Sequence, residues 1–202
     1  KLITKDNKKL YEILEPIGIV ALIIPWNFPM IVLSERLPYI LAAGNTVVIK
    51  PSENGTLSID YFIKILKNIN LPKGTVNYLT GNHKTGKYLA ENKNISMISF
   101  TGSTKTGKEI YKNASTTLKR LSLELGGKNP MVVFSDANLN KSCDEVIYSF
   151  THNAGQCCVS GSRLFIEKKI SLKFIEKIKK KLGKSDYNQS ITTINQYLKI
   201  KK

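Results

Sequence analysis

Over the first two thirds of the chain, short apolar runs alternate with segments of helical spacing. The run at residues 19–24 is apolar throughout and rich in β-branched side chains, which is typical of a parallel strand buried on both faces. Further strands are predicted at residues 46–49, 75–79, 95–100 and 118–125. Helices are predicted between them at residues 31–43, with Pro38 as an interruption, 57–68, 85–91 and 101–113. This alternation predicts an α/β fold with a doubly wound, Rossmann-like parallel sheet.

The pattern changes at the glycine pair Gly126-Gly127. Beyond it, strands are predicted at residues 131–134 and 162–167, and helices at residues 139–153 and 172–182. Residues 1–14 and 183–202 are polar and predict no clear element. We therefore expect a first domain over residues 1–125 and the beginning of a second α/β domain, incomplete, over residues 126–202.

Composition indicates an ordinary globular protein. The chain has 202 residues, of which 42% are hydrophobic and 23% charged. Its apolar runs are too short to cross a bilayer, and its first residues do not resemble a secretory signal. Three cysteines, two of them adjacent, do not form a disulfide framework. These features predict a cytoplasmic protein in a reducing compartment, without a membrane partner.

The net charge of +16 raises the question of nucleic-acid binding. Bidentate reading of bases favours arginine, but only Arg36, Arg120 and Arg163 are present. The lysines are spread along the chain without the interleaved aromatics of a stacking platform. We interpret the excess charge as a solvated lysine-rich surface and expect no specific nucleic-acid partner.

The two adjacent cysteines, Cys157 and Cys158, lie where a predicted helix gives way to a predicted strand. A thiol in such a junction is accessible and lies among unpaired backbone N–H groups, which lower a cysteine pKa. The alternative is a structural thiol, the expected state of Cys143 in the middle of its helix. A Cys–His hydrolase is a rival chemistry, but His152 has no evident residue to orient it. No Cys or His pair has metal-ligand spacing, so no metal is expected.

Four further motifs follow predicted strands at their carboxyl ends, where ligands bind in such sheets. In chain order they are Pro25-Trp26-Asn27-Phe28-Pro29, Lys50-Pro51-Ser52-Glu53, Phe100-Thr101-Gly102-Ser103-Thr104-Lys105-Thr106-Gly107 and Leu123-Glu124-Leu125-Gly126-Gly127-Lys128. An amide such as Asn27 can donate to an oxyanion without giving up a proton. Free N–H groups at a helix start can hold a pyrophosphate. A partly buried Glu124 would have a raised pKa and could act as a general base. Taken singly, each has an ordinary reading as a turn or surface residue.

Together with Gly155-Gln156-Cys157-Cys158, these motifs resemble those of the aldehyde dehydrogenase superfamily, in the same order. The resemblance implies that Cys158 is the nucleophile, that Asn27 and the Cys158 backbone N–H hold the oxyanion, and that Glu124 is the general base. It implies cofactor contacts from Pro25, Trp26, Lys50, Ser52, Glu53, Gly81, Gly86, Phe100, Thr101, Gly102, Ser103, Thr104, Lys105, Thr106, Gly107, Leu125 and Gly126. A carboxylate at Glu53 would accept the ribose hydroxyls and repel a 2′-phosphate, which favours NAD over NADP.

The implied function is oxidation of a small-molecule aldehyde to a carboxylic acid through a cysteine thiohemiacetal and thioester. Residues 1–125 would be the dinucleotide-binding domain and residues 126–202 part of the catalytic domain, with a cleft between them. Full-length family members form homo-oligomers. The loop at residues 81–86 departs from the family, being one residue shorter with His83 near a usual glycine position, where we interpret it as a solvated loop residue.

The chain is also less than half as long as family members and lacks a Glu-x-Phe-Gly-Pro motif. A fragment with little activity alone is therefore expected. The alternative is a truncated, inactive remnant that only binds nucleotide or a partner chain.

Overall fold

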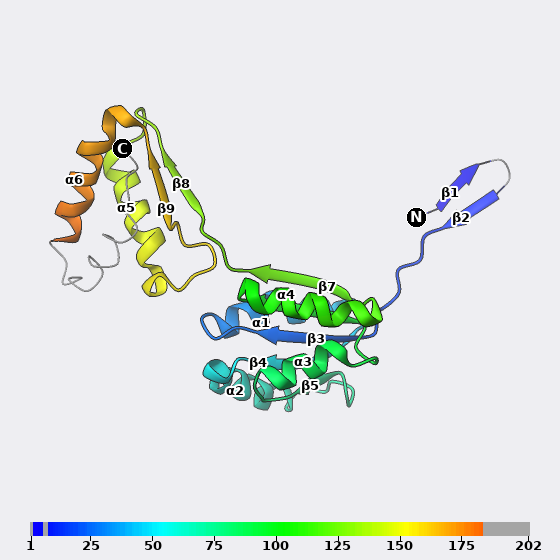
Figure 1. The fold of residues 1–202 in the computed structure, drawn as a ribbon. Coiled ribbons are helices and arrows are strands. Elements are labelled where there is room, and N and C mark those ends of the chain that lie inside the picture. The colour runs from blue at the N-terminus through cyan, green and yellow to red at the C-terminus, as the bar shows by residue number, and fades with distance from the viewer. Residues whose placement is uncertain (1, 6–7, 184–202) are drawn as a thin grey trace. The chain divides into compact units, whose positions relative to one another are not determined.

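The computed structural model describes residues 2–5 and 8–183 (Figure 1). The chain divides into two compact units, Lys1–Leu125 and Gly126–Lys202. The first unit contains β1 (Leu2–Lys5), β2 (Lys8–Tyr11), β3 (Ile19–Ile24), α1 (Pro29–Ala42), β4 (Thr46–Pro51), η1 (Glu53–Gly55), α2 (Thr56–Leu66), β5 (Val76–Tyr78), α3 (His83–Glu91), β6 (Met97–Gly102), α4 (Thr104–Ala114), η2 (Ser115–Thr117) and β7 (Arg120–Leu125).

A five-stranded sheet in the order β5-β4-β3-β6-β7 is the framework of the first unit. Every neighbouring pair is parallel, and the arrows of β3 and β7 point the same way in Figure 1. The order reverses between β3 and β6, because the chain builds outward from β3 first to one side and then to the other. The predicted doubly wound, Rossmann-like α/β fold is confirmed, and the five strands lie where the apolar runs indicated.

Helices cover both faces of this sheet, which explains why its central strands are apolar throughout. On one face, α1 and α2 pack against Leu22, Ile24, Val47 and Ile49. On the other, α3 and α4 pack against Ala21, Ile23, Ile98 and Phe100. Alternate residues of β3 therefore enter two separate cores, and β3 is the most deeply buried element of the unit.

Two expectations for the first unit are wrong. The N-terminal segment, expected to have no clear element, contains the antiparallel hairpin β1–β2. The predicted interruption at Pro38 is absent, because α1 continues through it as one helix. Leu33 and Leu37 on α1 are almost fully buried, and this packing offsets the backbone hydrogen bond that proline cannot donate.

The second unit contains β8 (Pro130–Val133), α5 (Leu139–Thr151), η3 (His152–Gly155), β9 (Arg163–Ile166), η4 (Lys168–Ile170) and α6 (Ser171–Leu182). Strands β8 and β9 pair in parallel. One face of the pair packs with α5 and α6 around Phe174, Val146 and Cys143. Three apolar side chains are exposed: Val132 on β8, Phe165 on β9 and Phe134 directly after β8. The predicted strands and helices are confirmed here too, whereas residues 184–202 lie outside the described part.

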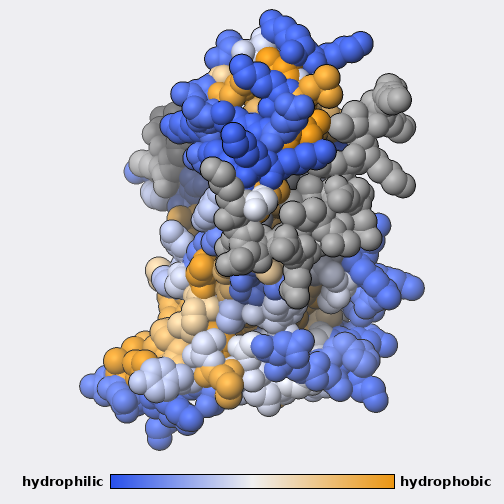
Figure 2. Space-filling model, turned by 90° about the vertical axis from the view of Figure 1, so that its left-hand side faces the viewer, coloured by the Kyte–Doolittle hydropathy of each residue, from blue (hydrophilic) through white to orange (hydrophobic). Residues whose placement is uncertain are grey.

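The surface charge is consistent with the solvated-surface interpretation. The last turn of α6 carries Lys179, Lys180 and Lys181, while Phe174, Ile178 and Leu182 on the same helix are buried. Figure 2 looks onto the side on which α6 lies in Figure 1, and hydrophilic side chains cover much of its upper part. Lys179 and Lys180 are exposed, Lys181 pairs with Asp144 of α5, and the apolar stripe of the helix faces the core.

Two helical glycines of the first unit lie in opposite surroundings and give a matched test of the packing. A Cβ at Gly86 of α3 would meet no atom within 4 Å, whereas a Cβ at Gly107 of α4 would lie 2.6 Å from Leu125 Cδ2. We expect Gly86→Ala to raise the free energy of unfolding by about 0.5–1 kcal/mol, because alanine favours the helix. Gly107→Ala should lower it by about 1 kcal/mol through overpacking. Denaturant unfolding measures both, and equal stabilisation by the two would contradict the close packing of α4 on β7.

Candidate active site

The sequence motifs of the first unit meet at one edge of the sheet. Parallel strands share the edge at which they end, and the register pairs Ile24 of β3 with Pro51 of β4. On the other side of β3, Ile23 pairs with Phe100 of β6. The loops after β3 and β6 therefore flank the point where the strand order reverses, which is where doubly wound sheets bind ligands.

The loops after β3 and β4 also touch directly. The Ser52 backbone N–H donates to the Ile24 carbonyl oxygen (2.8 Å). A Cβ on Gly55 would lie only 3.1 Å from the Trp26 Cα, so a larger residue would push the two loops apart. Trp26 is 47% exposed, and Pro25 and Asn27 are half-buried directly before α1. The first two motifs thus form one continuous surface.

Lys50 at the end of β4 is a buried cation. The residue is only 6% exposed, and its Nζ donates to the Pro51 carbonyl oxygen (3.1 Å). Burial lowers the pKa of this ammonium, and the Glu53 carboxylate partly offsets the effect. Glu53 itself is exposed, and Ser52 begins η1 by accepting a hydrogen bond from the Asn54 N–H. A buried ammonium thus lies next to an exposed carboxylate.

The loop between β6 and α4 exposes the start of a helix. Strand β6 runs two residues past its predicted end, through Thr101 and Gly102, and both are half-buried. Ser103 is the N-cap of α4, with Oγ accepting from the Thr106 N–H (3.2 Å) and donating to Thr106 Oγ1 (2.9 Å). Ser103 therefore takes up one of the helix-start N–H groups expected to be free. Exposed side chains of the first turn are those of Ser103, Thr104, Lys105 and Thr106, with Gly107 buried below them.

The loop before α3 uses glycine for a steric reason. Gly81 has a φ of 148°, and a Cβ there would overlap the Thr85 hydroxyl of α3. His83 is exposed, but it is the first residue of α3, so the interpretation of a loop residue is wrong. Asn82 caps this helix by accepting a hydrogen bond from the Lys84 N–H (2.9 Å). The short loop is closed by helix capping, with the predicted contact residue Gly86 inside the helix.

Glu124 is not partly buried, contrary to the expectation. It is 59% exposed, and its Oε1 lies 3.1 Å from Arg36 Nη2 of α1. The reason is its position on β7, an edge strand of the sheet, where Glu124 pairs in register with Thr101 of β6. The Arg36 guanidinium pairs with this carboxylate. The arrangement is close to the alternative interpretation, an ordinary surface residue. Leu125, the last residue of β7, is half-buried, and Gly126 directly after it is exposed.

In the second unit, the chain between α5 and β9 presents Cys158 at an exposed turn. Asn153, Ala154 and Gly155 have φ values of 49°, 56° and 75°, a left-handed run that costs non-glycine residues about 1–2 kcal/mol each. A tight turn follows, closed by the Ser160 N–H donating to the Cys157 carbonyl (3.1 Å). The strained backbone reverses the chain abruptly after α5 and leaves the thiol accessible, as predicted.

The pKa of Cys158 is raised, which contradicts the expected lowering. Partial burial of the sulfur is the main cause, and neighbouring Cys157 adds to it by charge and hydrogen bonding. Backbone N–H groups of Cys158 and Val159 act in the lowering direction, as the sequence suggested, but they are outweighed. Cys143 is fully buried with a raised pKa, which agrees with an inert core thiol.

His152, the candidate base of the rival Cys–His chemistry, contacts an aromatic ring. The His152 ring lies 5.0 Å from that of Tyr148, centroid to centroid, and the groups acting on the Cys158 thiol within the described part are cysteine and backbone. Within residues 2–5 and 8–183, no three His, Cys, Asp or Glu side chains gather as metal ligands. Over the same residues, no helix combines the length and apolar character needed to cross a membrane.

Sequence reasoning missed two residues that hold the Cys158 turn. The Asn129 side chain donates to the carbonyl oxygens of Cys158 (2.7 Å) and Ser160 (3.1 Å). Ser149 of α5 accepts from the Gly161 N–H (3.0 Å) through its hydroxyl. Their separation of 29 and 12 positions from their partners leaves no local pattern to find. The one signal in the sequence was that Asn129 directly follows Lys128, the last residue of the motif that contains Glu124.

Comparison with known proteins identifies the family. The family model described as "Aldehyde dehydrogenase family" matches residues 1–196. A Saccharomyces cerevisiae relative, aldehyde dehydrogenase [NAD(P)+] 2, is 42% identical over 175 residues, covering 86% of this chain and 35% of the relative. The chain thus spans about a third of the length of the curated relatives it matches.

Solved structures agree. An NAD-dependent aldehyde dehydrogenase from Sinorhizobium meliloti superposes with a TM-score of 0.79 at 43% identity, over 81% of this chain and 33% of that one. A betaine aldehyde dehydrogenase from Staphylococcus aureus, solved in complex with NAD+, gives a TM-score of 0.82 at 36% identity, over 84% and 34%. The motifs, the fold and these matches lead to one conclusion: the chain belongs to the aldehyde dehydrogenase family.

Proposed function

We propose that this chain supplies the cofactor site, the nucleophile and the general base for oxidation of an aldehyde to a carboxylic acid with NAD. The observation that carries the proposal is the register of the first unit, which brings the loops after β3, β4 and β6 to one edge of a parallel sheet. Family membership adds the reaction type, and the relatives named above include NAD-dependent enzymes.

The residues at this edge fit a dinucleotide. An exposed carboxylate at Glu53 suits ribose hydroxyls, and the buried Lys50 has N–H bonds beyond the one given to Pro51. The exposed first turn of α4 suits a pyrophosphate, which a helix N-terminus attracts. Trp26, which is half exposed in the loop after β3, offers an apolar surface near the point where the strand order reverses. We assign the remaining contacts to the loops at Pro25, Gly81 and Gly86, to residues 100–107, and to Leu125 and Gly126.

The chemistry assigned to the chain begins with the thiolate of Cys158, which attacks the aldehyde carbon. Asn27 and the backbone N–H of Cys158 donate to the resulting oxyanion. NAD, held by the residues at the carboxyl ends of β3, β4 and β6, would supply the acceptor for the hydride that leaves that carbon. Glu124 then takes a proton from the water that attacks the thioester and releases the acid, restoring the thiol. Since the pKa of Cys158 is raised, we expect the first step to accelerate as the pH rises.

The other assignments rest on the same family relationship. We propose residues 1–125 as the dinucleotide-binding domain and residues 126–202 as part of the catalytic domain. A cytoplasmic location and a homo-oligomeric assembly, with a small-molecule aldehyde as substrate, complete the proposal. The competing function is nucleotide binding without catalysis.

A single-turnover experiment separates these two functions. We expect the purified chain, mixed with NAD and a simple aliphatic aldehyde, to form NADH in a slow single turnover, together with an acyl adduct on Cys158 in smaller amount because Glu124 promotes its hydrolysis. Absorbance measures the NADH, and peptide mass spectrometry locates the adduct. Glu124→Gln should increase the adduct by slowing its hydrolysis, and Cys158→Ser should abolish it while Cys157→Ser does not. Calorimetric NAD binding without any adduct would support the competing function.

We expect Lys50 to lower the stability of the fold and to strengthen NAD binding. Replacing a buried ammonium by an apolar chain of similar volume is expected to raise the free energy of unfolding by about 1 kcal/mol in Lys50→Met. The same substitution should weaken NAD binding at least about tenfold, because a charge-assisted hydrogen bond is lost. Calorimetry and denaturant unfolding measure the two effects.

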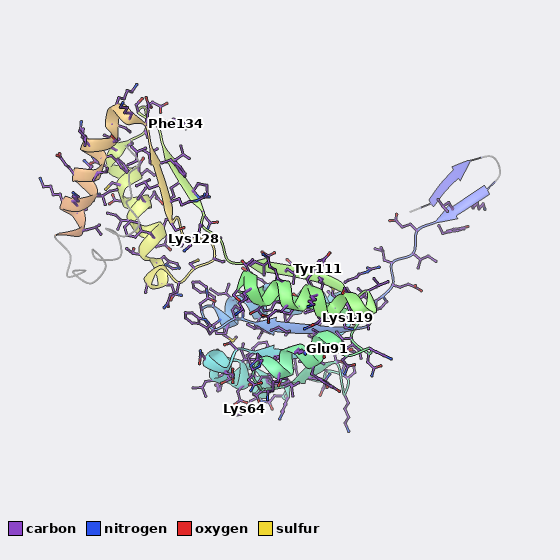
Figure 3. All side chains as sticks on the ribbon, in the orientation of Figure 1. Lys64, Glu91, Tyr111, Lys119, Lys128 and Phe134 are labelled. Atoms are coloured by element: carbon purple, nitrogen blue, oxygen red, sulfur yellow. The ribbon has the colours of Figure 1, made fainter. Side chains whose placement is uncertain are left out.

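The matched control is Lys119, also buried with a lowered pKa, which lies directly before β7 (Figure 3). Lys119→Met should stabilise the protein without changing NAD affinity. If both variants weakened NAD binding equally, Lys50 would have no specific role in the cofactor site.

Glu53 should set the choice between NAD and NADP. Its carboxylate would repel a 2′-phosphate, so Glu53→Gln is expected to raise NADP affinity relative to NAD by about tenfold. Glu91→Gln, which removes an exposed carboxylate at the end of α3, is the control and should leave the ratio unchanged (Figure 3). An unchanged ratio in Glu53→Gln, measured by competitive binding, would contradict the assignment.

A further inference from the structure

The turn that carries Cys158 is held from two sides. Cys158 and Val159 are its central residues, between Cys157 and Ser160. On one side, Asn129 donates to the Cys158 and Ser160 carbonyl oxygens (2.7 and 3.1 Å). On the other side, the Ser160 hydroxyl donates to the Ser149 carbonyl oxygen of α5 (3.2 Å). An exposed turn that follows a left-handed backbone run would otherwise have little to fix its direction.

Asn129 is itself held by the sheet. Its backbone carbonyl accepts a hydrogen bond from the Arg163 N–H (3.1 Å), which belongs to the Pro130–Arg163 pair at the start of the β8–β9 ladder. Figure 3 labels Lys128, the residue before Asn129, at the start of β8. A Cβ on Gly127 would lie 3.1 Å from the Asn129 Oδ1, so the glycine leaves room for this side chain. The amide is therefore a fixed donor rather than a mobile surface group.

The consequence for the thiol follows from peptide geometry. In a planar trans peptide, the C=O and N–H groups point in opposite directions. Asn129 holds the Cys158 carbonyl oxygen, and the same peptide unit ends in the Val159 N–H. That N–H is one of two backbone groups that stabilise the Cys158 thiolate. Holding the oxygen on one side keeps the N–H directed to the other, toward the sulfur.

We propose that Asn129 is a positioning residue for Cys158, which aims the Val159 N–H at the sulfur by anchoring the carbonyl of the same peptide unit. This inference rests on the proposed role of Cys158 as the nucleophile. The alternative is that Asn129 only stabilises the fold of the second unit. Both roles would make an Asn129 variant less stable, so stability alone does not separate them.

The chain offers a matched control for the experiment. Asn77 in β5 of the first unit also donates from its Nδ2 to two backbone carbonyl oxygens, those of Val47 (3.2 Å) and Gly74 (2.8 Å). Asn77→Ala therefore removes a pair of hydrogen bonds of the same kind as Asn129→Ala does, but in the unit that does not carry Cys158. A purely structural role predicts that neither substitution changes thiol reactivity in the folded protein.

The test is the rate at which iodoacetamide alkylates Cys158 in the full chain, followed by peptide mass spectrometry over a pH series. We expect Asn129→Ala to slow alkylation near neutral pH by about fivefold to tenfold, because a lost donor disfavours the thiolate. The pH at half-maximal rate should rise accordingly, while Asn77→Ala stays within about twofold of the unsubstituted chain. Equal rates for Asn129→Ala and the unsubstituted chain, or equal slowing by both variants, would overturn the proposal.

A second measurement needs no substitution. Amide hydrogen exchange in the unsubstituted chain should show the Val159 N–H protected, although Val159 is 72% exposed. Exchange at the rate of a free exposed amide would overturn the proposal even if Asn129→Ala failed to fold. Iodoacetamide and hydrogen exchange require no aldehyde, so the role of Asn129 is tested separately from the proposed function. Loss of the aldehyde adduct with the alkylation difference intact would reject the proposed function alone.

Discussion

The parallel register of β3 with β4 and β6 is the constraint on which the rest of the first unit depends. It brings the three loops that follow these strands to one edge of the sheet. The continuous apolar sequence of β3 makes this possible, because such a strand is stable only when covered on both faces. The helices pack against the two cores on either side of β3. The first residues of these helices then position the polar groups of the loops at the carboxyl end of the sheet.

Several features of the candidate site reduce stability locally. Lys50 keeps an ammonium buried, and Ala154 adopts a left-handed backbone conformation just before the Cys158 turn. Packing and hydrogen bonding elsewhere offset these costs, through the apolar cores and through the amide of Asn129. Residues that lower stability locally, surrounded by packing and hydrogen bonds that stabilise the fold, are typical of functional sites.

The fold could be predicted from the sequence because its signals are local. Each apolar run and each helical stretch between β3 and α6 indicated its element to within a few residues. The hairpin β1–β2 gave no such signal, since its strands are short and lysine-rich. The predicted interruption of the helix at Pro38 was wrong because local propensity predicts a break there, whereas burial of Leu33 and Leu37 keeps α1 continuous.

The environment of the site residues was harder to predict than their identity. The exposure of Glu124 depends on β7 being an edge strand, which only the strand order reveals. The raised pKa of Cys158 depends on the sum of opposing local effects, of which the sequence indicated only the backbone N–H groups. Asn129 was missed because its hydrogen bonds span 29 and 31 positions. Sequence motifs identified candidate chemistry, and tertiary structure set its electrostatics.

The central claim is that one edge of the parallel sheet is a nucleotide site, and backbone NMR during an NAD titration tests it most directly. We predict that the amide signals shifted by NAD belong to residues 25–28, 50–55 and 100–107, at the carboxyl ends of β3, β4 and β6. Signals from the opposite edge, such as those at the starts of β3, β6 and β7, should not move. Shifts confined to that opposite edge, or no shift at saturating NAD, would contradict the account.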